Sequence, residues 1–191
     1  MKQKSRTEYS VMNTTVAFLA QTLAIFMGFF TRVVFTRTLS EGYVGINGLF
    51  TDILNILSLS ELGVGTAITY ALYAPIARRD IKKQQILMRM FRNFYRITAG
   101  FVVLAGLCLI PFLDILMKDR PDVNHLIIIY LLYLLNSVVS YLLIYKKTLV
   151  DAHQMNYITV MYHNGFLVLQ DILQIIVLFL TRNFILFLVI A

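Results

Sequence analysis

Long apolar stretches are the feature that most limits how this chain can fold. Five mainly apolar windows span residues 11–35, 46–74, 97–116, 125–144 and 158–180. A helix needs ~20 such residues to cross the ~30 Å hydrocarbon core of a bilayer. A sixth apolar stretch begins near Phe184 and reaches Ala191, which is only ~12 Å of helix. The pattern predicts an all-α, polytopic transmembrane helical bundle with five complete spans and the start of a sixth.

The composition excludes the main soluble alternatives. Hydrophobic residues make up 59 % of the chain and charged residues 14 %, against ~25 % charged in soluble domains. A chain of this size cannot bury so much apolar surface internally, so the excess faces lipid. A soluble enzyme, a nucleic-acid-binding domain and a disordered tail are therefore excluded, despite the net charge of +7. The single cysteine, Cys108, excludes a disulfide framework and a CxxC site.

We expect residues 1–191 to form a single transmembrane domain. Because the sixth stretch is shorter than half a bilayer, we interpret the chain as the N-terminal part of a longer protein or an incomplete reading frame.

The distribution of basic residues predicts a cytoplasmic N-terminus. Twelve of the 17 fall on the side of the N-terminus: Lys2, Lys4, Arg6, seven within 75–96, Lys146 and Lys147. The opposite side holds Arg32, Arg37, Lys118, Arg120 and Arg182. Cytoplasmic segments are the richer in Lys and Arg. Within 75–96, apolar residues alternate with basic ones, which predicts a basic amphipathic cytoplasmic helix lying along the inner leaflet as an orientation anchor.

Polar residues inside the first two spans are the first candidates for function. Thr14, Gln21, Gly28 and Arg32 fall within about 40° on one helix face. This face is either a cavity wall ending in a cation or a small-residue packing surface, and Arg32 and Arg37 are either ligands or interfacial anchors.

The second span carries carboxylates on opposite faces. Asp52 shares a face with Gly48, Asn55, Gly63 and Thr66, whereas Glu61 lies about 180° away. Such a helix is either enclosed or broken, and the glycines within 61–66 favour a break, as in transporter sites. The alternative for Glu61 is a neutral, hydrogen-bonded acid or an ion pair with Arg32 or Arg37. The alternative for Asp52 is a structural ion pair near the interface.

The fourth and fifth spans each have a polar face as well. Their members are Tyr133, Asn136, Ser137 and Ser140 on the fourth, and Tyr157, Asn164 and Asp171 with Gln170 and Gln174 on the fifth. Hydrogen bonds between helices would explain both faces, and a shared wet cavity is the alternative. The histidines His125, His153 and His163 form no metal-ligand pair, and no catalytic or cofactor motif is present. We therefore expect a membrane path or binding cavity, with no enzyme activity, no metal and no cofactor.

Residues 45–68 (GINGLFTDILNILSLSELGVGTAI) resemble the second span of bacterial polysaccharide and O-antigen flippases (Wzx-type), in the MATE-like MOP superfamily. Residues 72–80 (LYAPIARRD) resemble that family's "LYxPxAxxD" entry to the cytoplasmic loop, and Arg32 and Arg37 ahead of Leu39 resemble its basic end of the first span. Ser40 and Asp52 depart from the family's usual Gly and Asn. The family has twelve to fourteen spans in two bundles, and this chain would supply one MATE-like N-terminal bundle.

The resemblance implies a transporter in the bacterial inner membrane that moves a lipid-linked oligosaccharide between leaflets by alternating access. Arg32 and Arg37 would then contact pyrophosphate, since guanidinium binds phosphate in a bidentate manner. Gln21, Asn47, Asn55 and Glu61 would contact sugar hydroxyls or a coupling ion. The partners implied are the lipid-linked substrate, membrane lipids, and a C-terminal bundle or second copy, with no nucleic acid.

Two other functions stay open at this stage. A cation-coupled drug exporter of the same superfamily would use the carboxylates Asp52, Glu61 and Asp171 for ion coupling. A polymerase or another non-transporting polysaccharide-assembly protein is the second, although a polymerase normally has a larger outer loop than the ten residues of 36–45.

Overall fold

The computed structural model describes residues 6–58, 64–117, 123, 125–153 and 155–191. All regular structure in these residues is helical. Four candidate spans are long and apolar enough to cross a bilayer: Thr14–Thr38 in α1 (Arg6–Thr38), Ile81–Phe112 beginning with α4 (Ile81–Leu109), α6 (Leu126–Ala152), and Tyr157–Thr181 in α7 (Asn156–Thr181). At most 28 % of each apolar window is buried within the chain, so most of its surface faces outward. The all-α class and a multi-pass membrane architecture are thus supported.

The predicted second span corresponds to two shorter helices. These are α2 (Glu41–Ser58) and α3 (Val64–Ala77), and neither is among the four candidate spans. Five complete spans are therefore not shown. Residues 61–63 of the predicted break, including Glu61, lie outside the described residues. The predicted sixth stretch begins as α8 (Phe184–Ile190), capped by the Asn183 side chain, which accepts hydrogen bonds from the backbone N–H groups of Ile185 and Leu186.

Two helices extend beyond the predicted spans. The amphipathic segment is helical from Ile81, but it continues without interruption into the third span as α4. It is therefore no separate helix that could lie flat on the leaflet while the span crosses it. Likewise α6 extends to Ala152, so Lys146 and Lys147 are helical. Lys, Arg and Gln are good helix formers. These polar residues therefore interrupt the apolar sequence of α4 and α6 without ending either helix. The third span closes with the short helices η2 (Ile110–Phe112) and α5 (Leu113–Leu116).

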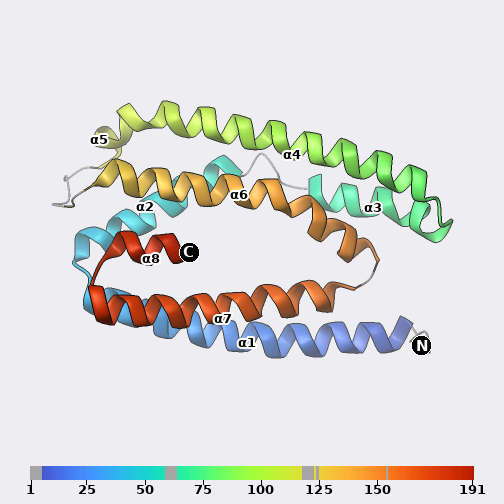
Figure 1. The fold of residues 1–191 in the computed structure, drawn as a ribbon, viewed down its shortest axis with the longest axis horizontal. Helices are drawn as coiled ribbons and strands as arrows, with labels where there is room; N and C mark the ends of the chain where they lie inside the picture. The colour runs from blue at the N-terminus through green and yellow to red at the C-terminus, as the bar shows by residue number, and fades with distance from the viewer. Residues whose placement is uncertain (1–5, 59–63, 118–122, 124, 154) are drawn as a thin grey trace.

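The helices form two layers that meet at one end of the molecule (Figure 1). In one layer α1 and α7 lie side by side, and in the other α6 packs against α3 and α4. The turn from α3 to α4, the N-terminus and the end of α6 all lie toward one end, whereas the α1–α2 turn and the start of α8 lie at the other. A buried aromatic cluster joins the layers at this second end: Phe35 lies 5.6 Å from Phe184 and Phe50 lies 5.1 Å from Tyr130, between ring centroids.

A glycine sets the separation of α4 and α6. A Cβ added at Gly106 would lie 2.5 Å from a Leu134 methyl carbon, so a larger residue here would require the buried Leu134 side chain or the helix to shift. The Tyr130 hydroxyl donates a 2.8 Å hydrogen bond to the Gly106 carbonyl oxygen in the same buried contact.

The turn between α3 and α4 is held by backbone and side-chain hydrogen bonds and by a helix cap at Asp80. The Pro75 carbonyl oxygen accepts hydrogen bonds from the Asp80 N–H at 2.9 Å and the Gln84 side chain at 3.2 Å. Arg79 adopts a left-handed conformation (φ 55°), as a residue just after a helix commonly does. The Asp80 carboxylate accepts from the Lys83 N–H at 3.0 Å and caps α4.

Replacing this cap should cost a small and specific amount of stability. Asp80→Ala removes the acceptor for the first turn of α4, and we expect it to lower the unfolding free energy by ~1 kcal/mol, or ~2–4 °C in melting temperature. Asp80→Asn keeps a side-chain oxygen and should retain most of it. Thermal unfolding of the detergent-purified protein, followed by helical circular dichroism, measures both. Equal losses in the two variants would contradict the capping role.

Candidate functional site

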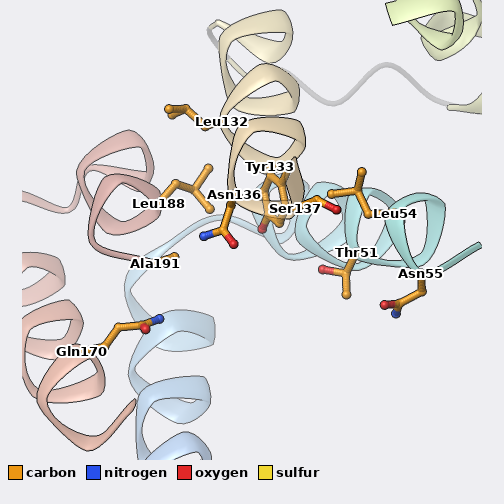
Figure 2. A pocket seen from close by; sticks show the side chains of 10 residues that line it. All are labelled: Thr51, Leu54, Asn55, Leu132, Tyr133, Asn136, Ser137, Gln170, Leu188 and Ala191. Atoms are coloured by element: carbon orange, nitrogen blue, oxygen red, sulfur yellow. The ribbon is translucent and has the colours of Figure 1, made fainter. Parts of the chain in front are cut away.

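A polar cavity lies where the two layers converge. Its volume is ≈ 370 Å³, within the ~300–1,000 Å³ typical of small-ligand sites. It is lined by residues of α2, α6, α7 and α8 together with the C-terminal residue: Thr51, Leu54, Asn55, Leu132, Tyr133, Asn136, Ser137, Gln170, Leu188 and Ala191. Figure 2 shows the Asn136 side chain extending from α6 into the space between α2 and α8, with Gln170 approaching from α7. We call this space the polar cavity.

Helical periodicity explains how each helix supplies its part of the lining. Tyr133, Asn136 and Ser137 recur at a spacing of three to four on α6, so they share one face. Thr51 and Asn55 are four apart on α2 and also share a face. The amide and hydroxyl groups therefore come from helices that are distant in sequence, and the lining offers both donors and acceptors without a carboxylate side chain from the described residues.

A tyrosine connects the cavity to two of the predicted residues. The Tyr133 hydroxyl donates a hydrogen bond to the Asn47 side-chain oxygen. The Arg32 guanidinium carbon lies 5.4 Å from the centroid of the Phe35 ring. Phe35 belongs to the buried cluster against which Tyr133 packs. Tyr133 and Asn47 thus form a hydrogen-bonded pair at the cavity, and the Arg32 cation lies over a ring of the neighbouring cluster. Arg32 is exposed, so its charge remains available to an anionic ligand.

The other residues predicted to bind substrate differ in their distance from the cavity. Asn55 lines the polar cavity. Gln21 is exposed on the Arg32 face of α1, but it lies ~16 Å along the helix from Arg32 and is absent from the lining. Arg37 is exposed in the last turn of α1, and five residues turn it ~140° away from Arg32. The structure therefore places Asn55 in the cavity lining and bonds Asn47 to the lining residue Tyr133, whereas Arg32, Gln21 and Arg37 are not among the lining residues.

The described carboxylates do not line the cavity. Asp52 is exposed on α2 beside the lining residue Thr51. Asp171 is half-buried and follows the lining residue Gln170, so it is turned ~100° from it around α7. Glu61 lies outside the described residues. Within the parts of the chain that the structure describes, no group of three or more His, Cys, Asp or Glu residues could hold a metal ion.

The other predicted polar faces divide between packing and exposure. Asn164 and Gln174 are buried, and the Gln174 amide donates a 3.2 Å hydrogen bond to the Phe187 carbonyl oxygen, which ties α8 to α7. Gly28 has no heavy atom within 4 Å of an added Cβ, so the small-residue face of α1 makes no close helix contact at that position.

Comparison with known protein families, curated proteins and solved structures found no match to this chain. The functional argument therefore depends on the residues and their arrangement.

The sequence left two interpretations open for the polar faces of the fourth and fifth spans, namely hydrogen bonding between helices or a shared cavity. Four residues of these faces line the cavity: Tyr133, Asn136, Ser137 and Gln170. Apart from Asn55, the sequence did not single out the other lining residues: Thr51, Leu54, Leu132, Leu188 and Ala191. For Thr51 the four-residue spacing from Asn55 was an available signal. Leu188 and Ala191 are apolar, and nothing local in the sequence indicates that α8 folds back onto α6.

Proposed function

We propose that this chain is the N-terminal bundle of a transporter that flips undecaprenyl-pyrophosphate-linked oligosaccharide across the bacterial inner membrane for surface polysaccharide synthesis. The main support is the convergence of amides and hydroxyls on one cavity, with the Arg32 cation over Phe35 in the cluster that Tyr133 packs against. Amide and hydroxyl groups match the donors and acceptors of sugar hydroxyls. The arginine matches the pyrophosphate, which accepts strong, charge-assisted hydrogen bonds.

In this proposal α2 and α3 together make the second span, which gives five spans and the start of a sixth in α8. We also propose a cytoplasmic N-terminus, from the excess of Lys and Arg on that side of the predicted spans. The α3–α4 turn, which belongs to the most basic segment, lies toward the same end as the start of α1 (Figure 1), and this supports the proposal.

Transport by alternating access requires a second bundle that faces the first. The proposal assigns this role to a C-terminal bundle of the same protein or to a second copy, closing over the cavity formed by α2, α6, α7 and α8. The carboxylates Asp52 and Asp171 lie outside the cavity lining, which favours an uncharged sugar-binding surface over the cation exporter.

The test compares two arginines of α1 in the complete transporter. We expect Arg32→Ala to lower surface polysaccharide at least ~10-fold, the effect of losing a charge-assisted hydrogen bond of ~1.5–3 kcal/mol. Arg37→Ala is the matched control, because it removes the same charge from an exposed residue of the same helix that faces elsewhere. Immunoblotting of membranes checks that both proteins are inserted equally. Normal polysaccharide in Arg32→Ala, or altered drug susceptibility without polysaccharide loss, would overturn the proposal.

A further inference from the structure

A second surface of this chain is basic and points away from the contacts that α4 makes with the bundle. Lys82, Arg89 and Arg96 recur every seven residues on α4, which places them within ~40° of one another around the helix. All three are exposed, as are Gln85 and Asn93 between them. We define these five residues as the α4 basic face. Phe91 and Tyr95 are buried and turned ~160° and ~120° from Arg89, so α4 packs on the bundle with its other side.

Apolar side chains adjoin this face and are equally uncovered. Ile86 is 68 % exposed and Met90 55 % exposed, and both border a surface hollow that also includes Lys82, Gln85, Arg89 and Asn93. A helix with basic residues beside exposed apolar ones suits the boundary between lipid headgroups and acyl chains. Long basic side chains can extend from that boundary toward phosphate while their methylene groups stay in the apolar layer.

The length of α4 lets its first turns extend beyond the hydrocarbon core. Its candidate span, Ile81–Phe112, has 32 residues and is ~48 Å long, more than the ~30 Å hydrocarbon core needs. Helix α3 runs beside its first turns, held by the bond from Gln84 to the Pro75 carbonyl, and a Cβ added at Gly65 would lie 3.6 Å from the Tyr95 hydroxyl. Tyr70 and Tyr73 of α3 are exposed, and tyrosine is enriched at membrane interfaces.

The excess of positive charge around α4 favours lipids with negatively charged headgroups. Residues 75–96 contain seven basic residues and one acid, Asp80, whose carboxylate already caps α4. We propose that the α4 basic face binds the headgroups of anionic phospholipids in the leaflet next to the α3–α4 turn. The inference does not depend on the transport proposal, because it concerns the side of α4 opposite to its contact with the bundle.

The absence of tryptophan from the chain allows a direct test. Ile86→Trp places a single fluorophore at an exposed position beside the face. The full chain is reconstituted in bilayers of phosphatidylcholine containing phosphatidylglycerol, with either lipid brominated near the headgroup. We expect brominated phosphatidylglycerol to associate with the probe site at least ~5-fold more strongly than brominated phosphatidylcholine, since each basic residue near an anionic surface contributes about this factor. The preference should fall as salt is added.

The matched variants separate local binding from general charge. Lys82→Gln with Arg89→Gln and Arg96→Gln, combined with Ile86→Trp, should abolish the preference. Lys146→Gln with Lys147→Gln changes exposed basic residues on α6 and should leave it intact. No quenching by either lipid would place Ile86 outside the bilayer and overturn the proposal. Equal quenching by both lipids would show no preference for the anionic headgroup and would also overturn it. Equal loss in the α6 variant would also overturn it. If the triple variant fails to fold, the salt titration of the Ile86→Trp protein decides the question, because a preference that salt does not weaken contradicts headgroup binding.

Discussion

Ser137→Trp should abolish transport by the complete protein, with no surface polysaccharide above background. Ser137 lines the polar cavity on the α6 face that also presents Tyr133 and Asn136. Its replacement by the largest side chain occupies a substantial part of a space of ≈ 370 Å³ and displaces the amide groups around it. The same variant should no longer retain the lipid-linked oligosaccharide in detergent, because the ligand and the indole compete for one volume. Polysaccharide immunoblots and substrate co-purification measure the two outcomes.

The control for this variant is Leu135→Trp. Leu135 is on the same helix, two residues earlier, but it is 58 % exposed and is not part of the cavity lining. An indole there would meet lipid and should leave transport near normal. Ser137→Ala, which removes the hydroxyl without adding bulk, should retain most activity. Full transport by Ser137→Trp at normal membrane levels would show that the substrate does not use this cavity.

Periodicity predicted which polar groups share a helix face, because that property depends only on nearby residues. It grouped Tyr133, Asn136 and Ser137 correctly, and all three line the cavity. It could not predict which face of α7 meets α6, because that depends on how distant helices pack. The sequence aligned Asp171 with Asn164, but Asn164 is buried, and Gln170 is the residue of α7 that reaches the cavity.

The helix ends show a related limit. Hydropathy locates the apolar part of a helix and not its termini, so it predicts residues 81–96 as a separate amphipathic element. In the structure they continue into the third span, since Lys, Arg and Gln favour helix and Asp80 provides the starting cap. The same argument explains why α6 passes through Lys146 and Lys147 to Ala152. Basic residues therefore mark where the apolar part of a helix stops, and not where the helix itself stops.

Gly106→Leu should destabilise the fold more than the loss of the α4 cap does. A side chain at this position meets Leu134 at the closest approach of α4 and α6, and the added bulk must separate the helices. Their separation also breaks the bond from the Tyr130 hydroxyl to the Gly106 carbonyl. We expect a loss of ~3 kcal/mol, or ~6–12 °C in melting temperature, measured by circular dichroism of the purified protein.

Two further variants decide whether this loss comes from the helix contact. Gly100→Leu changes the same residue type on the same helix, but an added Cβ there has no neighbour within 4 Å, so it should be nearly neutral. Leu134→Ala removes the methyl groups that the new side chain would meet and should recover part of the stability when combined with Gly106→Leu. Contacting residues of this kind show non-additive effects, typically of ~0.5–3 kcal/mol. Additive losses would mean that residues 106 and 134 are not in contact. The packing of α4 against α6, which turns the Tyr133 face toward the cavity, would then be wrong.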